Sequence, residues 1–168
     1  IACPNGYYSY SGASSCTLCP PGWRCPVTTG TMNAQCTPGT YSLGGQMSCT
    51  SCPAGYYCLN TSSSAATACL PGTYALAGST TCTSCAAGFA CPDTTTFSTS
   101  FPCSSGQYSP GGQAYCTSCP AGFYCNSLTT ASVQPCTPGS YSLGGTVSCT
   151  TCPAGSYCPV AKYVGVMN

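Results

Sequence analysis

The side chains best able to do chemistry in this 168-residue chain are its twenty cysteines, because histidine is absent and Arg24, Asp93 and Lys162 are its only charged side chains. The cysteines fall into groups of four, separated by 12, 2 and 5 residues, as in the group that begins at Cys36. Such a group can form two disulfides, bind zinc through its Cys-x-x-Cys pair, or act as a redox couple.

Disulfides fit the spacing and the composition best. Structural zinc sites commonly use two Cys-x-x-Cys pairs, whereas each group here has one pair and two single cysteines. A redox Cys-x-x-Cys motif normally begins a helix, and no helical hydrophobic period is present. Leu, Ile, Val and Phe together number only 18, too few for a large apolar core. We therefore expect cross-links to stabilise the fold, and neither a metal nor another cofactor.

Four cysteines allow three pairings in each group. We favour first with second and third with fourth, because each pair then encloses its own glycine–aromatic turn; the crossed pairing is the alternative. In a chain-entropy model these loops of 14 and 7 residues contribute about 3 and about 2.4 kcal/mol. The favoured bonds are Cys3–Cys16, Cys19–Cys25, Cys36–Cys49, Cys52–Cys58, Cys69–Cys82, Cys85–Cys91, Cys103–Cys116, Cys119–Cys125, Cys136–Cys149 and Cys152–Cys158.

The elements that must position these cysteines recur with a period of 33 residues and one step of 34. A fixed period of this size indicates a tandem-repeat array. We expect a small disulfide-rich fold, mostly irregular with short β-hairpins and no helix of note, built as an elongated rod of five units. The expected repeats are 1–35, 36–68, 69–102, 103–135 and 136–168.

Glycine and proline predict the turns within each repeat. Pro38-Gly39 fits a turn in which proline presets φ and glycine takes a positive φ. Gly44-Gly45 and Gly144-Gly145 are expected to be hairpin turns between short strands. The Ser/Thr-rich connectors have nearly constant length, which favours ordered segments over free linkers. They span 26–35, 59–68, 92–102, 126–135 and 159–168.

The low charge excludes several classes of function. A protein that binds nucleic acids or anionic membranes needs many Lys or Arg residues, and this chain has two. No apolar run is long enough to span a bilayer. Hydroxyl nucleophiles need a base and paired-carboxylate chemistry needs two acids, so we expect no enzyme. A net charge near zero lowers solubility, which favours a glycan coat or a self-assembled state.

The pattern Cys-x-x-Gly-x-Tyr, followed by Cys-x-x-Cys-Pro-Ala-Gly-x-Tyr, resembles the ephrin-receptor-like and TNF-receptor-like cysteine-rich repeats. It is also similar to the tail of laminin-type EGF modules and to cysteine-rich surface or flagellar-hair proteins of protists. The resemblance covers all five repeats, departs at Asn5, Trp23, Arg24, Ala86 and Ala90, and implies an extracellular disulfide rod.

Two kinds of site are expected outside the cysteines. Asn60-Thr61-Ser62 is the only N-glycosylation sequon, and O-linked sugars are expected on some of the Ser and Thr residues. A tyrosine two residues after the first glycine is expected to cover a disulfide in each repeat. The second aromatic of the later motif, Tyr57, Tyr124 or Tyr157, is a candidate for an outward-facing interface with protein or sugar.

These features predict an extracellular, secreted or cell-surface structural glycoprotein that assembles with copies of itself into a filament or coat. Both ends fall at a repeat boundary, which indicates either a slice of a longer array or head-to-tail joining. A heterologous contact of that kind propagates as a fibre. The alternative is the ligand-binding or adhesion ectodomain of a cell-surface receptor, although such surfaces usually carry charged rims.

Overall fold

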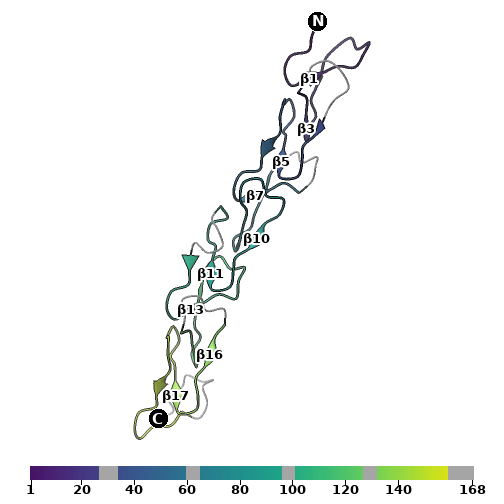
Figure 1. The fold of residues 1–168 in the computed structure, drawn as a ribbon. Coiled ribbons are helices and arrows are strands. Elements are labelled where there is room, and N and C mark those ends of the chain that lie inside the picture. Colours follow the sequence, from purple (N-terminus) through teal and green to yellow (C-terminus); the bar gives the residue numbers. More distant parts are fainter. Residues whose placement is uncertain (27–33, 60–64, 96–100, 127–131, 159–168) are drawn as a thin grey trace. The chain divides into compact units, whose positions relative to one another are not determined.

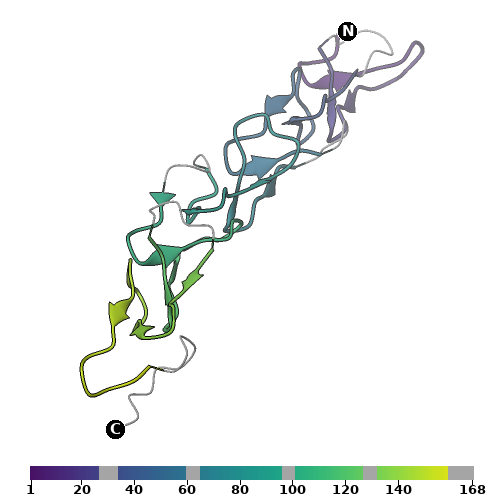
Figure 2. The ribbon, with the colours of Figure 1, turned by 60° about the horizontal axis from the view of Figure 1, so that its bottom comes forward.

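The fold is that of a computed structural model, in which residues 1–26, 34–59, 65–95, 101–126 and 132–158 are described. These residues form two-residue strands and no helix, and the strands pair into nine two-stranded sheets (Figures 1 and 2). The predicted disulfide-rich tandem repeat of β-hairpins is thereby confirmed. The strands are β1 (Tyr7–Tyr8), β2 (Thr17–Leu18), β3 (Trp23–Arg24), β4 (Ala34–Gln35), β5 (Thr40–Tyr41), β6 (Thr50–Ser51), β7 (Tyr56–Tyr57), β8 (Thr67–Ala68), β9 (Thr73–Tyr74), β10 (Thr83–Ser84), β11 (Phe89–Ala90), β12 (Phe101–Pro102), β13 (Gln107–Tyr108), β14 (Thr117–Ser118), β15 (Phe123–Tyr124), β16 (Gln134–Pro135), β17 (Ser140–Tyr141) and β18 (Thr150–Thr151).

The first hairpin of each repeat starts from a tight turn after the first cysteine. In repeat 2 the Thr40 amide donates to the Thr37 carbonyl at 3.0 Å, and Gly39 between them has a φ of +82°. Proline at the second position and a positive-φ glycine at the third are typical of a type II turn, so the predicted Pro38-Gly39 turn is confirmed. Strand β5 then pairs with β6, and the Cys52 amide closes the hairpin on the Gly39 carbonyl at 2.9 Å.

The second hairpin joins the later aromatic motif to the end of the connector. In repeat 2 the Tyr56 amide donates to the Pro53 carbonyl at 3.1 Å, around Gly55 with a φ of +83°. Strand β7 pairs with β8, and the Cys69 amide bonds the Gly55 carbonyl at 2.8 Å. The last two residues of four connectors are thus strands: β4, β8, β12 and β16. The rest of the ordered-connector prediction falls mainly outside the described residues.

The paired glycines take a different part from the one expected. Gly44 and Gly45 lie within the segment 42–49 that separates β5 from β6, and both have a positive φ. They do not form a two-residue hairpin turn, because β5 ends at Tyr41 and β6 begins only at Thr50. The Gly45 amide instead donates to the Cys19 carbonyl of the preceding repeat at 2.8 Å, and the Gly44 amide donates to the Ser42 hydroxyl of its own loop at 3.2 Å.

The chain divides into two compact units, and the division does not follow the repeat boundaries. The first unit comprises Ile1–Leu70, Tyr74–Thr83 and Thr94–Thr96, and the second comprises Pro71–Thr73, Ser84–Asp93 and Phe97–Asn168. Repeat 3 is thus divided: Tyr74–Thr83, most of its first loop, belongs to the first unit, and its second loop, within Ser84–Asp93, belongs to the second. This division arises because the second loop of one repeat packs against the first loop of the next.

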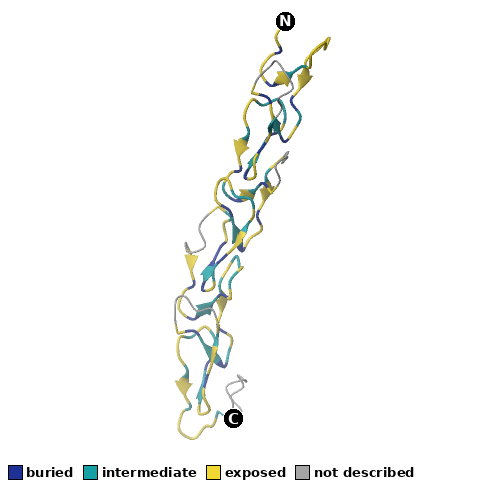
Figure 3. Ribbon diagram, turned by 45° about the vertical axis from the view of Figure 1, so that its right-hand side comes forward, coloured by how far each residue is buried: buried dark blue, intermediate teal, exposed yellow. Residues whose placement is uncertain are grey.

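Cysteine takes the place of the usual aliphatic core. Ala75 and Ala90 are the only buried hydrophobic residues other than cysteine in the described part of the chain. In Figure 3 the buried residues appear as short separate stretches in each unit, and many strands are exposed. The low content of large aliphatic residues therefore shows directly in the structure, where sulfur fills the small interior of each repeat.

Candidate functional site

The disulfides divide every repeat into a larger and a smaller loop. Within each repeat the first cysteine is bonded to the second and the third to the fourth, with no free thiol among the twenty. Cα atoms lie 5.6–5.8 Å apart in the larger loops and 5.9–6.2 Å apart in the smaller ones, distances that a disulfide spans without moving the backbone. The crossed alternative is not the pairing that the structure contains.

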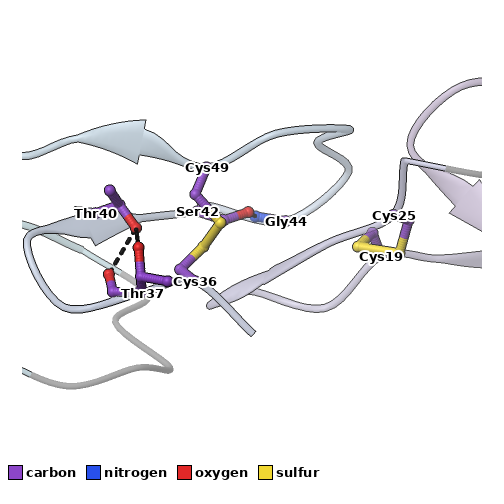
Figure 4. The surroundings of a disulfide bond; sticks show 8 residues. All are labelled: Cys19, Cys25, Cys36, Thr37, Thr40, Ser42, Gly44 and Cys49. Carbon is purple, nitrogen blue, oxygen red and sulfur yellow. Dashed lines mark hydrogen bonds between the residues drawn. A yellow bond between two sulfur atoms is a disulfide. The ribbon is translucent and has the colours of Figure 1, made fainter. Parts of the chain in front are cut away.

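Besides the bond that closes the second hairpin, such as that from Cys36 to the Gly22 carbonyl, consecutive repeats are joined by a junction of three backbone hydrogen bonds. Between repeats 1 and 2, Gly22 donates to the Ser42 carbonyl at 2.8 Å, Cys25 to that of Gln46 at 2.9 Å, and Gly45 to that of Cys19 at 2.8 Å. Figure 4 shows Cys19 and Cys25 next to the Cys36–Cys49 loop that receives them. The three further junctions use the equivalent donors and acceptors: Gly55–Ala75, Cys58–Ser79 and Gly78–Cys52; Gly88–Ser109, Cys91–Gln113 and Gly112–Cys85; Gly122–Ser142, Cys125–Thr146 and Gly145–Cys119.

Each junction also needs a close approach between two glycines. A Cβ placed on Gly6 would overlap the carbonyl oxygen of Gly45, with nothing flexible to yield because the obstacle is backbone. The same overlap would occur between Gly39 and Gly78, Gly72 and Gly112, and Gly106 and Gly145. The first glycine of every repeat that is followed by another thus has two reasons to be glycine, a positive φ and the absence of a Cβ.

A buried serine stabilises the loop that carries the glycine pair. Ser42 is fully buried, and its hydroxyl accepts a hydrogen bond from the Gly44 amide at 3.2 Å (Figure 4). The backbone carbonyl of Ser42 accepts the junction bond from the Gly22 amide. Ser109 and Ser142 hold the equivalent amides of Gly111 and Gly144. The serine therefore links the internal order of its loop to the contact with the preceding repeat.

In two repeats the equivalent loop forms without the glycine pair. Repeats 1 and 3 have Ser11 and Ala77 where the others have the first glycine, and a turn bond replaces the serine contact. This bond runs from Ala13 to the Tyr10 carbonyl in repeat 1 and from Ser79 to the Leu76 carbonyl in repeat 3, at 3.1 Å in both. In repeat 1 the ring of Tyr10 also lies edge-on to that of Tyr8, with centroids 5.4 Å apart, and its side-chain hydrogen bond with Tyr8 raises the pKa of Tyr10.

Replacing Ser42 by alanine is expected to destabilise its loop by about 1–2 kcal/mol, because the part-buried Gly44 amide loses its acceptor. The amide of Gly44 should then exchange with solvent roughly tenfold faster in hydrogen-exchange NMR. The matched control is Ser9→Ala, since the repeat 1 loop is held by the Tyr10–Ala13 bond. Equal effects of the two substitutions would contradict the role given to the serine hydroxyl.

The structure places the remaining candidate residues as follows. Tyr157 is 74% exposed, whereas Tyr57 and Tyr124 are half-buried beside the connector strands β8 and β16. The five recurring tyrosines, expected over the disulfides, are half-buried in every repeat: Tyr8, Tyr41, Tyr74, Tyr108 and Tyr141. The Asn60 sequon and Lys162 lie outside the described residues.

Sequence reasoning missed the serine and the junction bonds. The available signal was that serine follows the recurring tyrosine wherever a glycine pair comes next, and that repeat 3 has Ala75 together with Ala77.

A comparison with protein-family models and another with curated proteins give no match. No helix in the described ranges is long and apolar enough to cross a membrane. In that same part of the chain, no group of three or more His, Cys, Asp or Glu residues is arranged to hold a metal ion.

Proposed function

We propose that this chain is a structural glycoprotein of the cell exterior, a disulfide-stapled repeat rod that assembles with copies of itself into a filament or surface coat. The observation that carries the proposal is the junction, which repeats the same three hydrogen bonds four times with only backbone groups. A contact of this kind can be repeated without limit, because the smaller loop of any repeat can bond to the larger loop of another.

The disulfides support an extracellular site of action. Ten disulfides in a chain of this size are typical of secreted and cell-surface proteins, because the cytosol keeps thiols reduced. The resemblance to ephrin-receptor-like, TNF-receptor-like and protist surface repeats, proposed from the cysteine and glycine pattern, agrees with this location. Neither argument identifies a ligand, so a receptor or adhesion ectodomain is the competing proposal.

Exposed hydroxyls support the glycan part of the proposal. The strands between the second and third cysteines begin with threonine in all five repeats, and both of their residues are exposed: β2, β6, β10, β14 and β18. These threonines bury little surface, so attached sugars would not disturb the disulfides or the junctions. A sugar coat would also supply the hydration that a net charge of +1 does not.

The proposal is tested by the concentration dependence of assembly of the native, glycosylated chain. Sedimentation velocity and negative-stain electron microscopy should show polymers that lengthen as the concentration rises. Enzymatic removal of the sugars should lower the mass and increase lateral clumping, because a nearly uncharged surface is then uncovered. A chain that stays monomeric at every concentration would contradict assembly and favour the receptor alternative.

A further inference from the structure

One hydroxyl recurs in every repeat, directly after the second cysteine. The residue at this position is threonine five times: Thr17, Thr50, Thr83, Thr117 and Thr150. No other position between the first and the fourth cysteine has Ser or Thr in all five repeats. Valine has nearly the same shape and is equally suited to a strand, but it occupies none of the five positions. The recurrence therefore points to the hydroxyl group.

These threonines are accessible, whereas other hydroxyls of the larger loop are engaged. All five are exposed, on β2, β6, β10, β14 and β18. In repeat 2 the Thr40 hydroxyl donates to the Thr37 carbonyl at 2.6 Å, and Ser42 is buried. The Thr117 hydroxyl makes only a long, exposed contact with Gln113, at 3.4 Å. An enzyme can thus reach the five threonine hydroxyls without opening the fold.

The recurring tyrosine lies opposite this threonine across the first hairpin. The strand register pairs Tyr8 with Thr17, Tyr41 with Thr50, Tyr108 with Thr117 and Tyr141 with Thr150. Side chains that are directly opposed in an antiparallel pair share a face, with Cβ atoms roughly 4.5–5.5 Å apart. The tyrosines are half-buried, so part of each side chain is accessible beside the hydroxyl. A sugar on the threonine would lie within reach of the ring, whose apolar surface can pack against sugar C–H groups.

We propose that the threonine after the second cysteine is the O-glycosylation site of each repeat, and that its first sugar packs on the tyrosine opposite. The inference rests on the glycan part of the proposed function and specifies the attachment sites. In the transfer, the threonine Oγ1 bonds to the anomeric carbon of the sugar and the bond from that carbon to the phosphate of an activated sugar donor breaks. The hydroxyl proton passes to a base of the transferring enzyme.

Site mapping on the native chain tests the proposal and does not depend on any variant. Chymotryptic peptides of the reduced and alkylated protein are fragmented by electron transfer, which leaves sugars attached. We expect a sugar on Thr50 and on its four equivalents, and none on Thr40 or Ser42. Sugars confined to other hydroxyls would overturn this assignment and leave the chain a glycoprotein. A chain without any sugar would overturn the glycan part of the proposed function as well.

Thr50→Val is the sharpest substitution, because it removes the hydroxyl and keeps the shape. In the chain secreted from a host that glycosylates the parent protein, we expect repeat 2 alone to lose its sugar. The matched control is Thr40→Val in the same hairpin, which should keep it because the Thr40 hydroxyl is bonded to the Thr37 carbonyl. Full modification of repeat 2 in Thr50→Val would overturn the assignment.

The packing of sugar on ring is tested separately, at Tyr41. An aromatic ring shifts the NMR signals of sugar protons that lie over its face to higher field. This shift should persist in Tyr41→Phe, which keeps the ring, and disappear in Tyr41→Leu, both compared after their ten disulfides are verified by mass spectrometry. Sugar signals without such a shift in the parent chain would overturn the packing and leave the attachment site intact.

Discussion

Alanine at Gly106 is expected to destabilise the junction between repeats 4 and 5 by about 2–4 kcal/mol. The left-handed backbone conformation costs alanine about 1 kcal/mol, and the overlap with the Gly145 carbonyl adds about 1–3 kcal/mol. The junction amides of Gly122, Cys125 and Gly145 should lose protection in hydrogen exchange, while those of the first unit should not. The effect is local because each repeat depends mainly on its neighbours.

Gly139→Ala is the matched control for this experiment. Gly139 has nearly the same φ as Gly106, +82° against +79°, but nothing lies within 4 Å of its added Cβ. Its cost in a dilute, monomeric sample should therefore be only the backbone part, about 1 kcal/mol. If the two variants lose the same free energy, the close glycine approach is not what holds consecutive repeats together.

Removing the smaller disulfide of repeat 4 is expected to have the other large effect. Cys119→Ser with Cys125→Ser frees a loop worth about 2.4 kcal/mol in the chain-entropy model and places hydroxyls where both sulfurs are almost fully buried. The same cysteines supply two backbone groups of the junction with repeat 5. We expect a total loss of about 3–5 kcal/mol, measured by guanidinium unfolding of the remaining disulfide-bonded chain.

The control is the replacement of both Cys152 and Cys158 by serine. Their disulfide closes a loop of the same length in repeat 5. These cysteines are half-buried, so the loss should be close to the loop-closure contribution alone, about 2.4 kcal/mol. Limited proteolysis should cut the repeat 4 variant between repeats 4 and 5 and should leave the control intact between these two repeats. Equal stability of both variants and the parent would mean that the smaller disulfides do not support the junctions.

The sequence was sufficient for those features that depend on neighbouring residues. Pro38-Gly39 specifies its own turn, because proline and glycine restrict φ locally. The spacing of Cys52 and Cys58 around a glycine made their bond the preferred one, and it is the bond in the structure. Short hairpins were expected as well, but not their connections: β5 and β6 are joined by the segment 42–49 and not by a two-residue turn at Gly44-Gly45.

Contacts between repeats were not predictable in this way. Gly44 and Gly45 look like a hairpin turn in isolation, and their contact with Cys19 appears only when the preceding loop is in place. Ser42 looks like a surface residue for the same reason, because its burial depends on Gly22 of another repeat. The pairing of β7 with β8 was also missed, since a Ser/Thr-rich connector has no strand pattern of its own.

The central claim is that disulfides between consecutive cysteines replace an apolar core in all five repeats. The most direct measurement is thiol alkylation of the native chain, unfolded without reductant, followed by peptide mapping of the bonded pairs. We predict no alkylated cysteine among the twenty, and every bonded pair within one repeat, first to second and third to fourth. Alkylatable thiols, bound metal ions, or pairs that cross between the two loops of a repeat would contradict the account.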